Sequence, residues 1–195
     1  MALDCTSKLT ADIEKDCLNK PQAGIEVNAV LINFDDIDRT LSVIDATNPL
    51  LLTNLALNSP ETGFSLEGIK QVQGISYELV LKEDSFDGFK HTFSGVILSP
   101  TVANKESLDE MNNGSRFVVV VEKKYKGAVK AEAFEVLGWD NGLVKTEETY
   151  NSKESDGVTK FTLSSPDGME EGFAPRTLLE TDYATTKTAF DAKFG

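Results

Sequence analysis

The stretch of residues 116–143 constrains the fold of this chain more than any other. It contains the uninterrupted apolar run Phe117-Val118-Val119-Val120-Val121, whose β-branched residues predict a buried strand. Lys126-Gly127 is suited to a tight turn. Residues 133–137 form a second apolar run, followed by Asp140-Asn141-Gly142, a strong hairpin signal. We therefore expect these runs to pair at the centre of a β-sheet.

Alternating or continuous apolar residues predict further strands along the chain. In residues 25–33 the consecutive Val30, Leu31 and Ile32 break the alternation, which indicates burial on both faces or against a neighbouring subunit. Residues 50–57 fit either a buried strand or a helical turn. The other expected strands span residues 40–44, 64–68, 72–81, 89–98, 144–150 and 158–163. In the strand 72–81, Ile75, Tyr77, Leu79 and Leu81 share one face, as in a half-exposed antiparallel strand.

Three segments have helical patterns. The segment of residues 104–112 begins with Asn104, which can serve as its N-cap, and the segment of residues 10–18 begins with Thr10 in the same role. In residues 181–194, Tyr183, Lys187, Phe190 and Phe194 form one helical stripe. We expect the two terminal segments, residues 10–18 and 181–194, to need a neighbouring subunit to bury their apolar side chains.

The chain of 195 residues is expected to form one domain. The fold class is mainly β (α+β): an antiparallel β-sandwich or small barrel with two or three peripheral helices. Residues 1–24 are expected to form an N-terminal helical arm and residues 177–195 a C-terminal helical segment.

The formal net charge of −13 argues against an outer surface that grips nucleic acid or an anionic membrane. We expect no membrane binding by this chain. The first residues, Met1-Ala2-Leu3-Asp4, lack the pattern of a secretory signal, and no apolar run reaches the ~20 residues of a membrane-spanning helix. Cys5 and Cys17 are too few for a disulfide scaffold, and if they lie on one helix they are expected to be packing residues.

The chain contains one histidine, His91, without a nucleophile motif around it, and we interpret it as a surface residue of a strand. Asp35, Asp36 and Asp38 form the densest acidic cluster, but the spacing lacks the glycine and distal glutamate of a calcium loop. A solvated corner is the simpler interpretation. We therefore assign no catalytic, cofactor-binding or metal-binding residue, and expect no enzyme.

Two polar segments could contact neighbours. Lys123, Lys124 and Lys126 surround Tyr125 at an expected hairpin tip, where lysines protect a sheet from aggregation or meet an acidic surface of another subunit. Residues 164–175 contain two Gly and two Pro, and a loop of this length is often functional.

The N-terminal third carries a resemblance. The segment Asp16-Cys17-Leu18-Asn19-Lys20-Pro21-Gln22-Ala23-Gly24, followed by an apolar strand and Asn33-Phe34-Asp35-Asp36-Ile37-Asp38, resembles the opening of virion structural proteins of phages of Bacteroides-type bacteria, including crAss-like phages. The match covers about the first 40 residues, and the remainder is similar only in size and β content to a tail-tube or head-to-tail ring subunit.

The resemblance implies a homo-oligomeric ring or tube in the tail or connector of a phage particle. It implies synthesis in the bacterial host cytoplasm, residence in the virion, contacts with other tail or connector proteins, and DNA passing through a channel without specific binding. The alternative is a capsid-surface or glycan-binding β-sandwich module, with aromatic residues such as Trp139 and Tyr125 exposed on one face. A third possibility is an enzyme that uses Asp35, Asp36 or His91.

Overall fold

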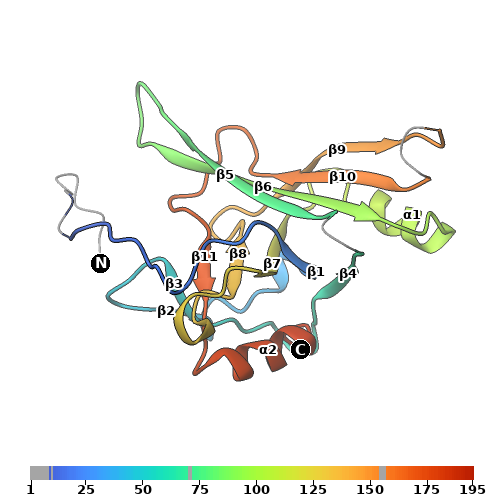
Figure 1. The fold of residues 1–195 in the computed structure, drawn as a ribbon. Coiled ribbons are helices and arrows are strands. Elements are labelled where there is room, and N and C mark those ends of the chain that lie inside the picture. The colour runs from blue at the N-terminus through green and yellow to red at the C-terminus, as the bar shows by residue number, and fades with distance from the viewer. Residues whose placement is uncertain (1–8, 10, 70–71, 154–156) are drawn as a thin grey trace.

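The computed structural model describes residues 9, 11–69, 72–153 and 157–195, which form two stacked β-sheets (Figure 1). In these residues the first sheet has seven strands, in the order β2 (Val43–Ile44), β3 (Leu51–Asn54), β11 (Arg176–Leu178), β8 (Phe134–Leu137), β7 (Phe117–Lys123), β1 (Ile25–Asn33) and β4 (Phe64–Glu67). The second has four, in the order β5 (Gly74–Val80), β6 (Gly88–Ile97), β10 (Thr159–Ser164) and β9 (Val144–Tyr150). Neither sheet closes into a barrel, so the expected sandwich is confirmed.

The central strands of the first sheet are apolar on both faces. In β7 the side chains of Val119 and Val121 join one hydrophobic cluster, whereas Val118 and Val120 join a second cluster on the opposite face. The neighbouring β1 divides in the same way, because Leu31 belongs to the first cluster whereas Val30 and Ile32 belong to the second. The continuous apolar runs thus reflect a sheet that is covered on both sides.

The second sheet covers one face of the first. Phe93 of β6 and Phe161 of β10 pack edge to face, with ring centroids 6.3 Å apart, in the cluster that also holds Val119 and Val121. The helix α1 (Val102–Glu110) follows β6 and buries Leu108 in this cluster. Its cap is Thr101 rather than Asn104, since the Thr101 hydroxyl oxygen accepts a hydrogen bond from the backbone N–H of Asn104 at 3.3 Å.

The helix α2 (Tyr183–Asp191) covers the other face of the first sheet. Phe190 is buried and lies with its ring centroid 5.3 Å from that of Phe134, while Tyr183 stacks on Phe134 at 5.8 Å. The C-terminal helix is therefore confirmed, but the expectation that it needs a neighbour for burial is wrong. The aromatic stripe is satisfied within the chain.

Two further expectations about local structure are wrong. Within the described residues, the segment 11–20 is not helical and lies exposed. Asp140-Asn141-Gly142 does not close a hairpin, because this corner connects β8 of the first sheet to β9 of the second. The corner turns at Gly138 and Gly142, whose φ angles of 74° and 79° favour glycine.

The connection between β7 and β8 is longer than a tight turn. It includes the short 3-10 helix η2 (Ala128–Lys130), whereas a second one, η1 (Phe34–Asp36), follows β1. Residues 50–57 fitted either a strand or a helical turn, and the structure has a strand there, β3 at Leu51–Asn54. No helix in the described part of the chain is long and apolar enough to cross a membrane.

Candidate functional site

The hairpin of β5 and β6 forms an arm whose tip stands clear of the other strands (Figure 1). Tyr77 pairs with His91 in this hairpin, and their rings lie edge to face, so Tyr77 shares the face that His91 presents to the body. Leu79 and Leu81 follow at intervals of two residues and continue this face toward the tip. The apolar face of the arm thus extends beyond the surface that covers it.

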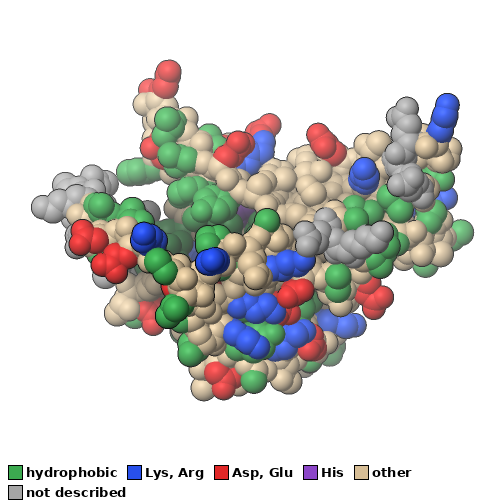
Figure 2. Space-filling view, in the orientation of Figure 1, with side chains coloured by type: hydrophobic (Ala, Val, Ile, Leu, Met, Phe, Trp, Pro, Cys, Tyr) green, Lys and Arg blue, Asp and Glu red, His purple; other side chains and the backbone are tan. Residues whose placement is uncertain are grey.

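The arm leaves large apolar side chains in water. Leu81 is 74% exposed and Phe86, at the tip, is 82% exposed, while Tyr77 and Leu79 are exposed by more than half. Figure 2 shows hydrophobic side chains along the arm and around the hollow beneath it. A patch of this kind is characteristic of a surface that binds another protein.

The segment 11–20 adds further exposed apolar side chains. Ile13 is 88% and Leu18 is 93% exposed. The Asp16 carboxylate accepts hydrogen bonds from the backbone N–H groups of Leu18 and Asn19 at 2.8 and 3.0 Å, which gives the segment a local turn. Cys17 is exposed, so its expected packing role is wrong, and Cys5 lies outside the described residues.

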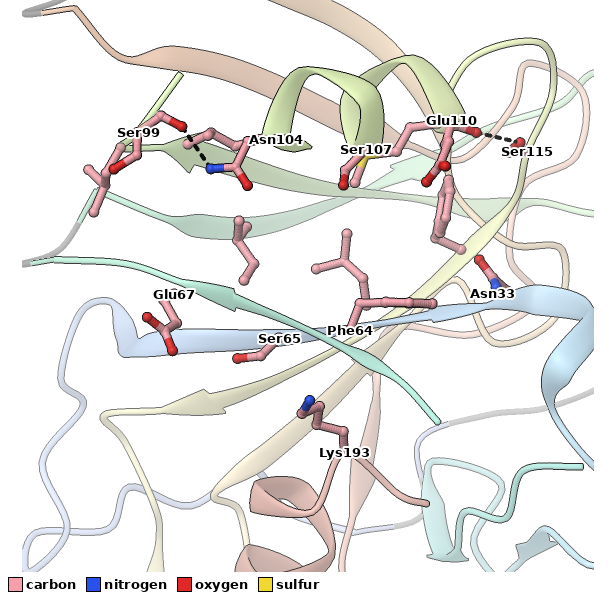
Figure 3. Close-up of a pocket in the computed structure, with 16 residues that line it drawn as sticks. Asn33, Phe64, Ser65, Glu67, Ser99, Asn104, Ser107, Glu110, Ser115 and Lys193 are labelled. Atoms are coloured by element: carbon pink, nitrogen blue, oxygen red, sulfur yellow. Dashed lines mark hydrogen bonds between the residues drawn. The ribbon is translucent and has the colours of Figure 1, made fainter. Parts of the chain in front are cut away.

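A pocket of about 740 Å³ lies between α1 and β4, the outer strand of the first sheet (Figure 3). Its apolar lining includes Leu31, Leu66, Ile97, Met111 and Phe117, and the exposed Phe64 of β4 also lines it. Polar and charged side chains, among them Glu67, Glu110 and Lys193, complete the lining. Among the described residues β4 pairs with β1 on one side, and its other side ends the sheet. Such an edge can accept a further strand.

The arm tip and the pocket lie at opposite ends of β6. The tip precedes Gly88, the first residue of this strand, and the pocket is lined by Ile97, the last one. Ten residues of strand at about 3.3 Å each separate them by roughly 30 Å. The exposed apolar arm and the open pocket are thus two different surfaces on two sides of the molecule.

The second candidate site is a buried polar corner around His91, between the two sheets. His91 is buried, which overturns its interpretation as a surface residue. Nδ1 accepts a hydrogen bond from the backbone N–H of Gly138 at 3.2 Å, and Nε2 lies 2.9 Å from the carbonyl oxygen of Phe173. These partners match a neutral ring with the proton on Nε2. Burial lowers the pKa of His91 to about 4.

Glu171 and Arg176 complete this corner. The Glu171 carboxylate has no exposed surface and accepts hydrogen bonds from the backbone N–H groups of Asp140 and Asn141 at 2.6 and 3.0 Å. Arg176 is bound to both carboxylate oxygens of Asp140, at 3.0 and 3.4 Å, and donates from Nε to the carbonyl oxygen of Pro49 at 2.9 Å. Burial raises the pKa of Glu171 to about 7.

The corner has titratable groups but no arrangement for nucleophilic catalysis. Both ring nitrogens of His91 are used in backbone hydrogen bonds, and both oxygens of Glu171 are used in the same way. A general base needs a nitrogen or oxygen that can reach a substrate. The corner therefore connects segments of the chain rather than presenting a reactive group.

The acidic cluster of residues 35–38 stabilises a turn. One Asp38 carboxylate oxygen accepts hydrogen bonds from the Thr40 hydroxyl at 2.6 Å and from the backbone N–H groups of Thr40 and Leu41 at 2.8 and 3.0 Å. These bonds, the hydroxyl one above all, lower the pKa of Asp38. Asp36 accepts from the side-chain amide of Asn33 at 2.8 Å, and Asp35 lies 3.6 Å from Arg116. No group of three or more potential metal ligands occurs in the part of the chain that the structure describes.

The lysines expected at a hairpin tip are bound within the chain. Lys123 pairs with Glu135 at 3.3 Å, and Lys126 pairs with Glu122 and with Glu26, the latter at 3.2 Å. Trp139 is buried and Tyr125 is half-buried, so these two aromatics do not form an exposed platform.

Sequence reasoning missed the polar corner, although it singled out the loop of residues 164–175 by its length. Glu171 is the one buried carboxylate of this loop, and its neighbours in the sequence give no sign of burial. The arm was visible as the alternation of Tyr77, Leu79 and Leu81, but not its projection from the body.

No protein-family model, curated protein or solved structure matches this chain, so the arrangement of arm, pocket and polar corner is the evidence on its function.

Proposed function

We propose that this chain is a structural subunit of a phage particle that assembles with copies of itself into a ring or tube of the tail or connector. The observation that carries the proposal is the placement of an exposed apolar arm and an open pocket, lined by both apolar and polar side chains, at opposite ends of β6. Two different surfaces that bind each other join subunits head to tail, and such contacts close into rings or continue as filaments.

The chemistry of the two surfaces supports a second copy as the partner. The pocket lies beside the outer strand β4, while the arm carries an outer strand, β5, with apolar residues at intervals of two. Pairing of two sheet edges satisfies backbone groups of both strands and buries the side chains on either side. The exposed Ile13 and Leu18 supply further apolar area for the same interface.

The net charge of −13 suits a subunit that surrounds DNA without binding it. Carboxylates that line a channel repel phosphate groups, so a polynucleotide can pass without a stable contact. This acidic character, together with the resemblance of residues 16–38, favours the tail or connector over other particle components. Trp139 is buried, so the one tryptophan of the chain is not available to a glycan ligand.

The test is the assembly state of the purified chain at high concentration. We expect rings or tubes in negative-stain images and a mass well above that of the 21.3 kDa chain in light scattering. The variant Leu81→Glu should lower the assembled mass without changing the unfolding temperature, because Leu81 is exposed in the isolated chain. Leu41→Glu, an exposed leucine on the loop before β2, is the matched control and should assemble normally.

Deletion of residues 1–20 provides a second test. Because the described part of this segment is exposed, its removal should reduce assembly and leave the thermal stability of the chain unchanged. A monomer at every concentration, in the intact chain and in all variants, would contradict the proposal.

A further inference from the structure

The three arginines of the chain gather at the corner between the two sheets. Arg176 is bound to Asp140, and Arg116 donates a hydrogen bond to the carbonyl oxygen of Asn141 at 3.4 Å. Arg39 lies close enough for the charges of the other two arginines to act on it. The planar guanidinium groups of the chain are thus concentrated at one place.

Two of these groups, which we call the arginine pair, share one aromatic ring. The guanidinium carbons of Arg39 and Arg116 lie 4.7 and 4.3 Å from the ring centroid of Phe34, and that of Arg39 lies 4.2 Å from the ring of Trp139. A Cβ atom at Gly142 would lie 3.0 Å from the Phe34 ring, so this glycine leaves room for the arrangement. A guanidinium over a ring face still presents N–H donors at its edge.

The arginine pair has unused capacity for a carboxylate. Among the residues that the structure describes, Arg39 donates no hydrogen bond and has no ion pair, and its partial burial lowers its pKa. Arg116 lies 3.6 Å from the exposed Asp35, and such a surface pair contributes little. The nearby Asp36 and Asp38 are used in hydrogen bonds of their own turn. Both guanidinium groups can therefore bind a further carboxylate.

The arginine pair adjoins one end of the pocket. Phe34 follows Asn33, and Arg116 lies between Ser115 and Phe117, while Asn33, Ser115 and Phe117 all line the pocket. Figure 3 shows Asn33 and Ser115 at the same end of it. The backbone N–H of Phe34 donates to the carbonyl oxygen of Arg116 at 2.9 Å, which joins the two segments there. Since consecutive Cα atoms are about 3.8 Å apart, the arginine pair lies just beyond this end.

The tip of the arm is acidic. Glu83 and Asp84 are exposed, and in the described part of the chain neither has an ion pair, whereas Lys82 is bound to Glu170. These two carboxylates follow Leu81 by two and three residues, within about 10 Å of chain at 3.3 Å per residue. They therefore continue the arm directly beyond its exposed apolar face.

The charges of the pocket direct this tip beyond it. Glu67 and Glu110 line the pocket together with a single ammonium group, that of Lys193. Like charges at a contact are unfavourable, so the pocket itself does not suit an acidic segment. An arm whose apolar face lies against the pocket would carry its tip past the end of the pocket, where the arginine pair lies.

We propose that the arginine pair binds the carboxylates of Glu83 and Asp84 from the arm of a second copy of this chain. The inference rests on the proposed function, because it uses the same head-to-tail contact and adds its charged part. Arginine and carboxylate groups form paired, directional hydrogen bonds. Sheet edges alone can pair in several registers, so these bonds would select the one in which subunits join.

The test is the assembled mass of two variants of the full chain, measured by light scattering separately and as an equimolar mixture. The tip variant, Glu83→Lys with Asp84→Lys, and the arginine variant, Arg39→Glu with Arg116→Glu, each place like charges at the contact. Each alone should need at least about tenfold more protein to assemble than the unmodified chain. In the mixture every contact between the two variants joins opposite charges, so assembly should recover.

The matched control is Glu132→Lys with Glu147→Lys, which makes the same charge change as the tip variant at exposed positions outside the arm and the pocket. It should assemble at least as well as the unmodified chain. Normal assembly of the tip and arginine variants, or a mixture that does not recover, would overturn the inference and leave head-to-tail assembly in place. An unmodified chain that stays monomeric would overturn both.

A second measurement covers the case in which the arginine variant fails to fold. Arg39→Gln with Arg116→Gln removes the charges without introducing new ones. In this background the tip variant should cause no further loss of assembly, because its effect depends on the arginines. An equal loss in both backgrounds would overturn the inference. So would duplex DNA that binds the unmodified chain but not the glutamine variant, since the arginine pair would then bind phosphate groups.

Discussion

The imidazole Nδ1 of His91 accepts a hydrogen bond from the backbone N–H of Gly138 at 3.2 Å. This contact joins β6 of the second sheet to the corner that follows β8 of the first. The ring is placed so that its other nitrogen meets Phe173 in the loop after β10. A single neutral histidine thus connects three segments that are far apart in the sequence.

His91 should make the chain sensitive to acid. Its pKa is lowered from the ordinary value of 6.5 to about 4, so between these values the unfolded chain takes up a proton that the folded chain does not. This group therefore lowers the free energy of unfolding as the pH falls from about 6.5 to about 4. Glu171 acts in the opposite direction between about pH 4.5 and pH 7. The pH dependence of the free energy of unfolding of the intact chain therefore combines both groups.

The contribution of His91 can be isolated with His91→Ala. This variant should lose about 2–4 kcal/mol at neutral pH, since it leaves a cavity and two unpaired backbone groups. The loss should shrink toward pH 4, as measured by urea unfolding at several pH values. Lys160→Ala, at an exposed position of β10, should show no such loss. An equal loss for His91→Ala at all pH values would show that the ring does not titrate as its burial indicates.

Two glycines provide a matched test of packing between the strands of the second sheet. A Cβ atom at Gly95 would lie 2.4 Å from the Phe161 ring, whereas one at Gly74 would meet nothing within 4 Å. Gly95→Ala should therefore lower the free energy of unfolding by about 1–3 kcal/mol, because the ring must shift in a packed core. Gly74→Ala should change it by less than about 0.5 kcal/mol. Similar results for the two variants in chemical denaturation would contradict this packing.

The C-terminal helix should contribute to the stability of the isolated chain. Phe190 is buried against Phe134 and also contacts Phe194, with ring centroids 5.3 and 6.3 Å away. Phe190→Ala should cost about 3–5 kcal/mol, and deletion of residues 183–195 should prevent stable folding. Thermal and urea unfolding would measure both effects.

The control for this helix is Thr188→Ala, which removes an exposed side chain from the same element and should be nearly neutral. If the deletion instead lowered only the assembled mass, the contacts of α2 with the sheet would have to be much weaker than its burial indicates.

The strands could be predicted from the sequence because they depend on local patterns. The run of residues 117–121 is apolar at every position, and such a strand gains most when both of its faces are covered. The same holds for Val30, Leu31 and Ile32, which the structure buries in two clusters. Helix α2 was predictable as well, because its aromatic residues repeat with the helical period.

The candidate sites were harder to predict from the sequence than the strands and helices. The alternation of Tyr77, Leu79 and Leu81 was visible in the sequence. That these side chains project beyond the body depends on how the two sheets are stacked. The predicted helix at residues 10–18 failed because its apolar residues find no surface to cover in this chain, and a short helix without packing is marginal in water.

The sequence by itself determined most of the strands and the helices α1 and α2, since side-chain shape and apolar spacing act over a few residues. Tertiary structure alone decided that Asp140-Asn141-Gly142 leads from one sheet to the other, and that His91, Glu171 and Arg176 are buried at that corner. The stability of a buried polar group depends on partners supplied by distant segments. Here those partners are Pro49, Gly138, Asp140, Asn141 and Phe173, and only the folded chain brings them together.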